Sequence, residues 1–276
     1  MQVIGNMRFG LTVINAWSTS FQLEMAKEAE KAGWDGFFLW DHLMFDWDPW
    51  VLLGAVAAVT EKMRLGPLVT PLARRRPQKV AKEAVTLDHL SKGRAVLGVG
   101  LGGNEQEFSE FGEESDAKMR AKKLDEALEV ITELWSEKPV EHYGENYVVD
   151  NVEFTVKPVQ KPRIPIWVGG NSKPALRRAS RFDGWFPECP SRSADYPGIS
   201  VEELKDSVAF VLKNRSARGR FEIVYAVETD DNSRPTLTLV RRLWQLGVTW
   251  VLENVHGLRY SEDEALERVR MGPPRI

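Results

Sequence analysis

Short apolar runs alternate with helical patterns along almost the whole of this chain. The expected strands cover residues 8–14, 35–40, 63–69, 94–99, 166–168, 183–186, 221–227 and 249–252. A helical pattern follows each, at residues 21–32, 49–60, 77–90, 115–135, 173–182, 201–214, 235–246 and in a closing helix capped by Ser261. Eight such units predict an α/β fold, a (β/α)8 TIM barrel, because eight parallel strands can close inside a ring of helices.

One segment interrupts this alternation. Residues 142–158, HYGENYVVDNVEFTVKP, alternate polar and apolar side chains as a β-hairpin does. They come after the fourth helix, so we expect an interrupted barrel with a hairpin insertion at that point. The chain, residues 1–276, then forms a single barrel domain. A doubly wound sheet has the same local pattern, so the barrel prediction depends on the number of units.

A glycine-rich turn ends the fourth strand. In GRAVLGVGLGGN, residues 93–104, an apolar run leads into glycines, which are typical of places where the backbone closely approaches another group. Gly98, Gly100 and Gly103 have the spacing of a dinucleotide-binding fingerprint, which alone would indicate a nicotinamide-dependent dehydrogenase. Three strand–helix units precede this turn, and that position favours a barrel strand over the opening of a Rossmann fold.

Composition excludes several classes of protein. With 37 basic and 40 acidic residues the net charge is −3, so we expect no nucleic-acid partner. The one cysteine, Cys189, excludes an internal disulfide and a cysteine-rich metal site, and fits the reducing cytoplasm. No apolar run approaches the roughly 20 residues of a membrane span, and the N-terminus lacks the pattern of a signal peptide. No zinc-binding or serine-nucleophile motif is present, so we expect no metal.

Functional residues of such a barrel lie at the carboxyl ends of its strands. Asp41 and His42 directly follow the second strand, and this pair suits proton transfer, with the carboxylate orienting the imidazole. The alternative is a helix-start aspartate beside a packed histidine. Leu68 and Val69 end the third strand. Other residues at strand ends are Phe186, Glu188, Glu253, Asn254 and His256.

The segment after the fifth strand predicts an anion site. Gly169, Gly170, Asn171 and Ser172 precede a helix, and backbone N–H groups at a helix start bind anions without a lysine. The alternative is an ordinary helix cap with flexible glycines.

Two further features have both a functional and a structural interpretation. The basic run Arg74–Arg75–Arg76 is either a solvated loop or a partner for an anionic group. Ten tryptophans are present, and some either wall an apolar substrate pocket or belong to the core; these are Trp17, Trp40, Trp47 and Trp185.

Five segments, in order, resemble the bacterial-luciferase-like superfamily of flavin- and deazaflavin-dependent oxidoreductases. They are WDGFFLWDHL (34–43), RLGPLVTPLARRRP (64–77), LDHLSKGRAVLGVGLGGNEQEF (87–108), KPVQKPRIPIWVGG (157–170) and RASRFDGWFP (178–187). The resemblance covers nearly the whole chain and implies an interrupted (β/α)8 barrel. It also implies a cofactor, coenzyme F420 or FMN, a small-molecule substrate and a homodimer. The chemistry implied is hydride transfer or, with FMN, monooxygenation.

The resemblance assigns site residues by position. Asp41 and His42 match a pair beside the deazaflavin ring in the branch that uses F420, which favours that cofactor. Leu68 and Val69 match a pair often joined by a cis peptide against the ring. Gly102 and Asn104 match the turn that lines the cofactor, and Gly169 and Gly170 match the backbone cradle for its phosphate. Asn171 and Ser172, which start the following helix, are predicted to bind the same phosphate.

Two further implications concern specificity. The run Arg74–Arg75–Arg76 would meet the anionic tail of F420. In the family's sugar-phosphate dehydrogenases an acidic residue stands where this chain has Leu101, which argues against that activity. The two alternatives are a nicotinamide-dependent dehydrogenase and a non-catalytic flavin-binding relative.

Overall fold

Parallel strands form the centre of the molecule. The structure, a computed structural model, describes residues 7–14, 17–44, 47–188, 198–216, 219–229 and 233–274. Nine strands pair in the order β3-β2-β1-β11-β10-β9-β8-β5-β4. Their bounds are β1 Arg8–Val13, β2 Gly36–Leu39, β3 Arg64–Pro67, β4 Thr70–Pro71, β5 Leu97–Gly100, β8 Ile166–Gly169, β9 Gly184–Phe186, β10 Glu222–Val227 and β11 Trp250–Val255. A parallel bridge between Leu65 and Ala95 joins the two edges. Because β3 and β4 are two parts of one broken strand, the predicted eight-stranded barrel is confirmed.

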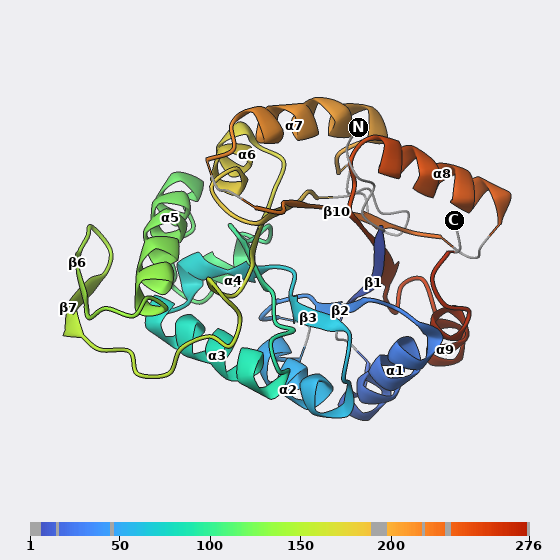
Figure 1. The fold of residues 1–276 in the computed structure, drawn as a ribbon, viewed down its shortest axis with the longest axis horizontal. Coiled ribbons are helices and arrows are strands. Elements are labelled where there is room, and N and C mark those ends of the chain that lie inside the picture. The colour runs from blue at the N-terminus through green and yellow to red at the C-terminus, as the bar shows by residue number, and fades with distance from the viewer. Residues whose placement is uncertain are drawn as a thin grey trace.

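Helices surround this sheet on its outer side (Figure 1). They are α1 Thr19–Ala32, α2 Pro49–Val59, α3 Pro77–Leu90, α5 Ala117–Leu134, α6 Lys173–Ala179, α7 Val201–Lys213, α8 Arg234–Gln245 and α9 Glu262–Arg270. The hairpin β6 (Val140–Tyr143) and β7 (Val148–Val152) lies outside the ring and follows α5, so the predicted insertion is confirmed (Figure 1).

The barrel has an outer and an inner apolar core. Outward-facing strand residues pack against the helices, whereas a smaller cluster fills the interior. Phe38, Trp167 and Trp250 form the centre of this inner cluster, with ring centroids 5.4 to 5.8 Å apart. Such a plug makes the interior a packed core, so ligands are restricted to the barrel mouth.

Close strand packing explains two glycines of the fingerprint-like sequence. A Cβ on Gly98 would lie 2.1 Å from the carbonyl oxygen of Pro67, and one on Gly100 would lie 2.4 Å from Val69 Cγ2. Gly66 is equally constrained, since its Cβ would lie 2.0 Å from the oxygen of Val96. These glycines let β3 and β5 approach each other, which is a role in the barrel wall.

Local chemistry fixes several helix ends. Ser261 caps α9 in a reciprocal capping box with Glu264, as the sequence predicts. Gly33 ends α1 in the left-handed conformation, with φ of 90°. Arg94 closes the end of α2 by donating to the carbonyl oxygens of Ala57, Thr60 and Met63.

Some predicted boundaries were wrong. The third strand was expected over residues 63–69 but breaks after Pro67, and the expected loop at 70–76 contains β4 and the 3-10 helix η1, Leu72–Arg74. The eighth strand reaches Val255 because its polar residues are buried among polar partners, which an apolar pattern does not reveal. The short helix α4, Gln106–Ser109, was not predicted. Cys189 lies outside the described residues.

Two searches of the described residues are negative. No helix there is long and apolar enough to cross a membrane. No group of three or more histidine, cysteine or acidic side chains there is arranged to hold a metal ion.

Candidate functional site

The residues singled out by sequence gather at one end of the barrel. Asp41 follows β2, Leu68 and Val69 lie between β3 and β4, Gly102 follows β5, and Gly169 ends β8. Because the strands are parallel, their carboxyl ends share one face.

The break between β3 and β4 is a cis peptide bond between Leu68 and Val69, as the resemblance implies. Leu68 is buried in the inner cluster, and the half-buried Val69 packs at its edge. Val69 also lies over two glycine positions, since a Cβ on Gly169 would be 3.0 Å from Val69 Cγ1. The wall of β5 and β8 beneath Val69 is therefore formed largely by backbone.

A buried ionic network, which we call the Asp41 network, lies beside this break. Asp41 Oδ1 accepts from Arg74 Nη2 at 3.2 Å and from Arg75 Nη2 at 2.9 Å. Arg74 also donates to the carbonyl oxygen of Asp41 at 2.8 Å and to Glu107 Oε2. His42 Nδ1 lies 2.8 Å from Glu107 Oε1. Two strand-end residues are thus joined to each other through Arg74 and Glu107.

Burial and charge set the state of this network. The side chains of Asp41, Arg74 and Glu107 are 0%, 3% and 2% exposed, whereas His42 is 23% exposed. Burial alone would raise the pKa of Glu107, but hydrogen bonds from Arg74 and His42 outweigh it and hold that pKa below its usual value. Glu107 is therefore a carboxylate at neutral pH. Asp41 Oδ2 is buried with no hydrogen-bond partner among the described residues.

Sequence reasoning missed Glu107 and misjudged Arg74. The solvated-loop interpretation of the basic run is wrong for Arg74, which is almost fully buried. Its guanidinium forms ion pairs with Asp41 and Glu107. Arg76 is exposed. Glu107 could have been noticed as an acidic residue shortly after the glycine turn. Its partners Arg74 and His42, however, lie 33 and 65 residues away in the sequence.

The glycine turn after β5 is held by an aromatic and an arginine. Gly102 has φ of +86°, and a Cβ there would lie 2.7 Å from the Phe108 ring. Arg120 stacks on that ring at 4.3 Å and donates to the carbonyl oxygens of Leu101 and Gly102. Asn104 Oδ1 accepts from the backbone N–H of Gln106 at 3.1 Å. The turn is therefore firmly placed.

The segment after β8 uses its side chains locally. Ser172 Oγ accepts from the N–H of Ala175, as in an ordinary cap. The side chain of Asn171 exchanges two hydrogen bonds with the backbone of Glu188, and the N–H of Gly170 donates to Phe186. No hydrogen bond between described residues engages the backbone N–H groups of residues 171–173. These N–H groups are the donors that remain for an anion.

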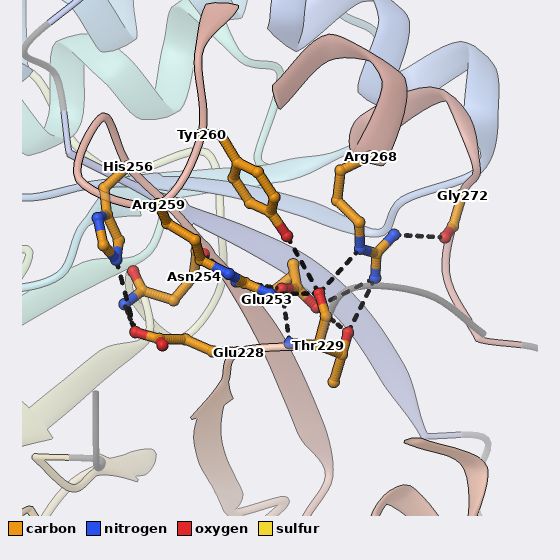
Figure 2. A network of polar contacts seen from close by, with 9 residues as sticks. All are labelled: Glu228, Thr229, Glu253, Asn254, His256, Arg259, Tyr260, Arg268 and Gly272. Carbon is orange, nitrogen blue, oxygen red and sulfur yellow. Dashed lines mark hydrogen bonds and ion pairs between the residues drawn. The ribbon is translucent and has the colours of Figure 1, made fainter. Parts of the chain in front are cut away.

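The polar residues at the end of β11 separate onto two sides (Figure 2). Asn254 and His256 lie with Glu228, which follows β10, whereas Glu253 points the other way toward Thr229 and Arg268. Successive residues of a strand face opposite sides, so only Asn254 continues the inward face of Trp250 and Leu252.

The four tryptophans do not share one environment. Trp185 is fully buried in the outer core, and its Nε1 donates to the oxygen of Gly170. Trp40 lies at the mouth, with its ring centroid 5.7 Å from that of His42. Trp47 is half exposed and donates to the oxygen of Trp17. Of the four, Trp40 has a described contact with the Asp41 network, through its ring pair with His42.

The chain matches a family model and several known sequences. Residues 8–209 match the family model described as luciferase-like monooxygenase. An uncharacterized protein of Mycobacterium tuberculosis is 31% identical over 259 residues, which cover 84% of each chain. The F420-dependent glucose-6-phosphate dehydrogenase of Microbacterium testaceum is 37% identical over 193 residues, covering 66% of this chain and 55% of that enzyme.

Solved structures share the fold. The monooxygenase RslO1 of Streptomyces bottropensis superposes with a TM-score of 0.77 at 18% identity, covering 96% of this chain and 97% of that one. The coenzyme F420-dependent tetrahydromethanopterin reductase of Methanopyrus kandleri gives 0.75 at 17% identity, covering 96% and 98%. An FMN complex of a Baeyer–Villiger monooxygenase from Pseudomonas putida gives 0.69 at 15% identity, covering 97% of each chain. With its barrel, its hairpin insertion and a match over most of its length, the chain belongs to the luciferase-like monooxygenase family.

Proposed function

We propose that this protein is an oxidoreductase that binds coenzyme F420 or FMN at the carboxyl ends of its barrel strands. The observation that carries the proposal is the Asp41 network, which presents an imidazole and an unpartnered carboxylate oxygen at that end. Catalysis is assigned to His42 and Asp41. The residues proposed to hold the cofactor are Asp41, His42, Leu68, Val69, Gly102, Asn104, Gly169, Gly170, Asn171 and Ser172.

The residues present fit a flavin-type group. Asp41 Oδ2 is a buried acceptor, and the rings of FMN and F420 carry an N–H donor. Gly103 borders open space, since a Cβ there would meet no atom within 4 Å. The backbone N–H groups of residues 171–173 suit the phosphate. When bound, such a group supplies hydride transfer or, in the case of FMN, oxygen activation.

The chain's own residues provide placement and proton handling. Glu107 accepts from His42 Nδ1 and from Arg74, which fixes the orientation of the imidazole. Held in this way, the imidazole of His42 is proposed to take part in proton transfer at the carboxyl end of the barrel. Arg74 and Arg75 hold the Asp41 carboxyl group in place through their contacts with Oδ1.

Several observations favour F420 over the other cofactors. The pair Asp41 and His42 stands where the F420 branch has its ring contacts, and a relative at 37% identity is named as F420-dependent. The nicotinamide alternative loses its main support, because Gly98 and Gly100 serve strand packing.

Side-by-side titration of the purified protein with F420, FMN and NADPH tests the function. We expect tight binding of F420, weaker binding of FMN and no saturable binding of NADPH. Saturable NADPH binding with neither flavin-type cofactor bound would contradict the proposal.

A homodimer in the cytoplasm, with no nucleic-acid partner, completes the proposal. Helix α2, PWVLLGAVAAV, carries no charge, and its Val51 is 77% exposed. Leu90 of α3 is 52% exposed and lies against Gly54 of α2. This apolar face suits a second copy of the chain. Sedimentation of the wild type as a dimer, and of Val51→Glu as a monomer, is the expected result; a monomeric wild type would contradict it.

A further inference from the structure

The barrel mouth has a polar half opposite the glycine-lined half. On β1, β11 and β10 the inward face ends in Thr12, Asn254 and Glu228, directly above the apolar plug. Thr12 and Asn254 are paired neighbours in the sheet, and Asn254 Nδ2 donates to Glu228 Oε1 at 3.3 Å. His256 Nε2 lies 3.5 Å from the same oxygen (Figure 2). We call this set the polar layer.

The polar layer connects to the proposed reacting residue. Trp40 Nε1 donates to Thr12 Oγ1 at 2.8 Å, and the Trp40 ring lies beside the His42 ring. An uninterrupted line of side chains therefore runs from Glu228 through Asn254, Thr12 and Trp40 to His42. A molecule held by the polar layer is also next to the Asp41 network.

The chemistry of the polar layer selects its ligand. Asn254 is 7% exposed, and its Oδ1 is buried with no hydrogen-bond partner among the described residues. An orphan acceptor of this kind is costly unless a ligand supplies a donor. Glu228 adds a carboxylate, and the inward-facing ends of β1, β2, β10 and β11 carry no lysine or arginine among the described residues. The layer therefore favours a hydroxyl donor and disfavours a phosphate or carboxylate.

We propose that the polar layer is the substrate-recognition site and that it takes an uncharged, hydroxyl-bearing small molecule, an alcohol, with its O–H donating to Asn254 Oδ1. The inference rests on the proposed function, since it places the alcohol beside the cofactor. It makes Asn254 a specificity-determining residue and Glu228 its positioning partner.

Three probes that share a cyclohexyl ring test the ligand class: cyclohexanol, cyclohexyl methyl ether and cyclohexanecarboxylate. Tryptophan fluorescence reports binding to the cofactor-loaded protein, because Trp40 borders the layer. We expect cyclohexanol to bind about tenfold more tightly than the ether or the carboxylate, the usual effect of one well-placed hydrogen bond. Equal affinity for the alcohol and the ether, or preference for the carboxylate, would overturn the inference without any variant.

A matched pair of variants tests the residue. Asn254→Leu removes the acceptor at similar volume, and we expect it to abolish the preference for the alcohol while the dissociation constant of the cofactor is unchanged. Asn214→Leu, the same substitution at an exposed position on the end of α7, should leave both unchanged. Retained preference in a folded Asn254→Leu would overturn the inference.

Cofactor titration of the wild type separates this inference from the proposed function. A protein that binds F420 or FMN but does not distinguish the probes contradicts the inference alone. If neither cofactor binds, the proposed function fails. The affinities of the three probes are then measured on the protein without cofactor. Absence of a preference for cyclohexanol there overturns the inference independently.

Discussion

Two buried ionic networks lie at the same end of the barrel and differ in completeness. In the first, the Asp41 network, one carboxylate oxygen of Asp41 has no partner among the described residues, and the partly exposed His42 forms its outer end. In the second, Glu253 uses both oxygens: Oε1 accepts from the N–H of Thr229 and from Arg259, and Oε2 accepts from the Thr229 hydroxyl and from Arg268 (Figure 2).

This difference distinguishes a network that serves the fold from the network that we propose to serve the cofactor. Arg268 is 2% exposed and also donates to the carbonyl oxygen of Gly272, so the second network ties β11 to α9 and the C-terminal segment. Both oxygens of the Glu253 carboxylate are thus engaged by described partners. The Asp41 network retains a buried carboxylate oxygen with no partner among the described residues, which the proposed cofactor ring could use.

Removing Glu253 should give the largest effect, on stability alone. Glu253→Ala leaves Arg268 and Arg259 without their carboxylate, and losing one partner of a buried pair costs about 3–5 kcal/mol. Denaturant unfolding measures the loss. Glu202→Ala, which breaks the exposed pair with Arg242, should cost less than about 1 kcal/mol. Equal effects of the two variants would show that the second network does not stabilise the fold.

His42→Asn should affect turnover. Asparagine keeps a hydrogen-bonding group but cannot act as an acid or base near neutral pH, so turnover at saturating cofactor should fall about 10²-fold or more. Steady-state assays with the best substrate of an alcohol panel measure this. Lower cofactor affinity with normal turnover would make His42 a placement residue. A variant with both properties intact would return it to ordinary packing and remove most of the case for F420.

Gly170→Asp should weaken cofactor binding by about 2 kcal/mol or more, because a carboxylate there repels the phosphate. The position has φ of +111°, and a Cβ lies 3.2 Å from Ala175, so any side chain is strained. Gly170→Ala is therefore the control for the strain alone. An equal dissociation constant for the alanine and aspartate variants would place the phosphate elsewhere.

The smallest effect concerns acid stability. Because the pKa of Glu107 is lowered in the folded protein, its stabilisation is complete above the ordinary glutamate value of about 4.3 and is lost as pH falls through the folded pKa. Glu107→Gln should therefore unfold with a weaker dependence on pH in this acid range. Identical acid-unfolding curves for variant and wild type would mean that Glu107 is not held as a carboxylate by Arg74 and His42.

The barrel and part of the candidate site could be predicted from the sequence. Strand–helix alternation predicted the barrel. The position directly after β2 marked Asp41 and His42 as candidate site residues. Both predictions depend on short segments of the sequence. Glu107 and Arg74 are far apart in the sequence, and only the closed barrel brings them together. Period-two alternation along β11 places Asn254 and Glu253 on opposite faces, but the predicted strand ends at Leu252 and therefore does not include either residue.

Cofactor affinity of Asp41→Asn tests the central claim most directly. The substitution preserves size but removes the charge that Arg74 and Arg75 hold in place. We predict tight F420 binding by the wild type, about tenfold weaker binding by Asp41→Asn, and no change for Asp150→Asn on the exposed hairpin. A folded wild type that binds neither F420 nor FMN, or an Asp41→Asn variant with wild-type affinity, would contradict the account.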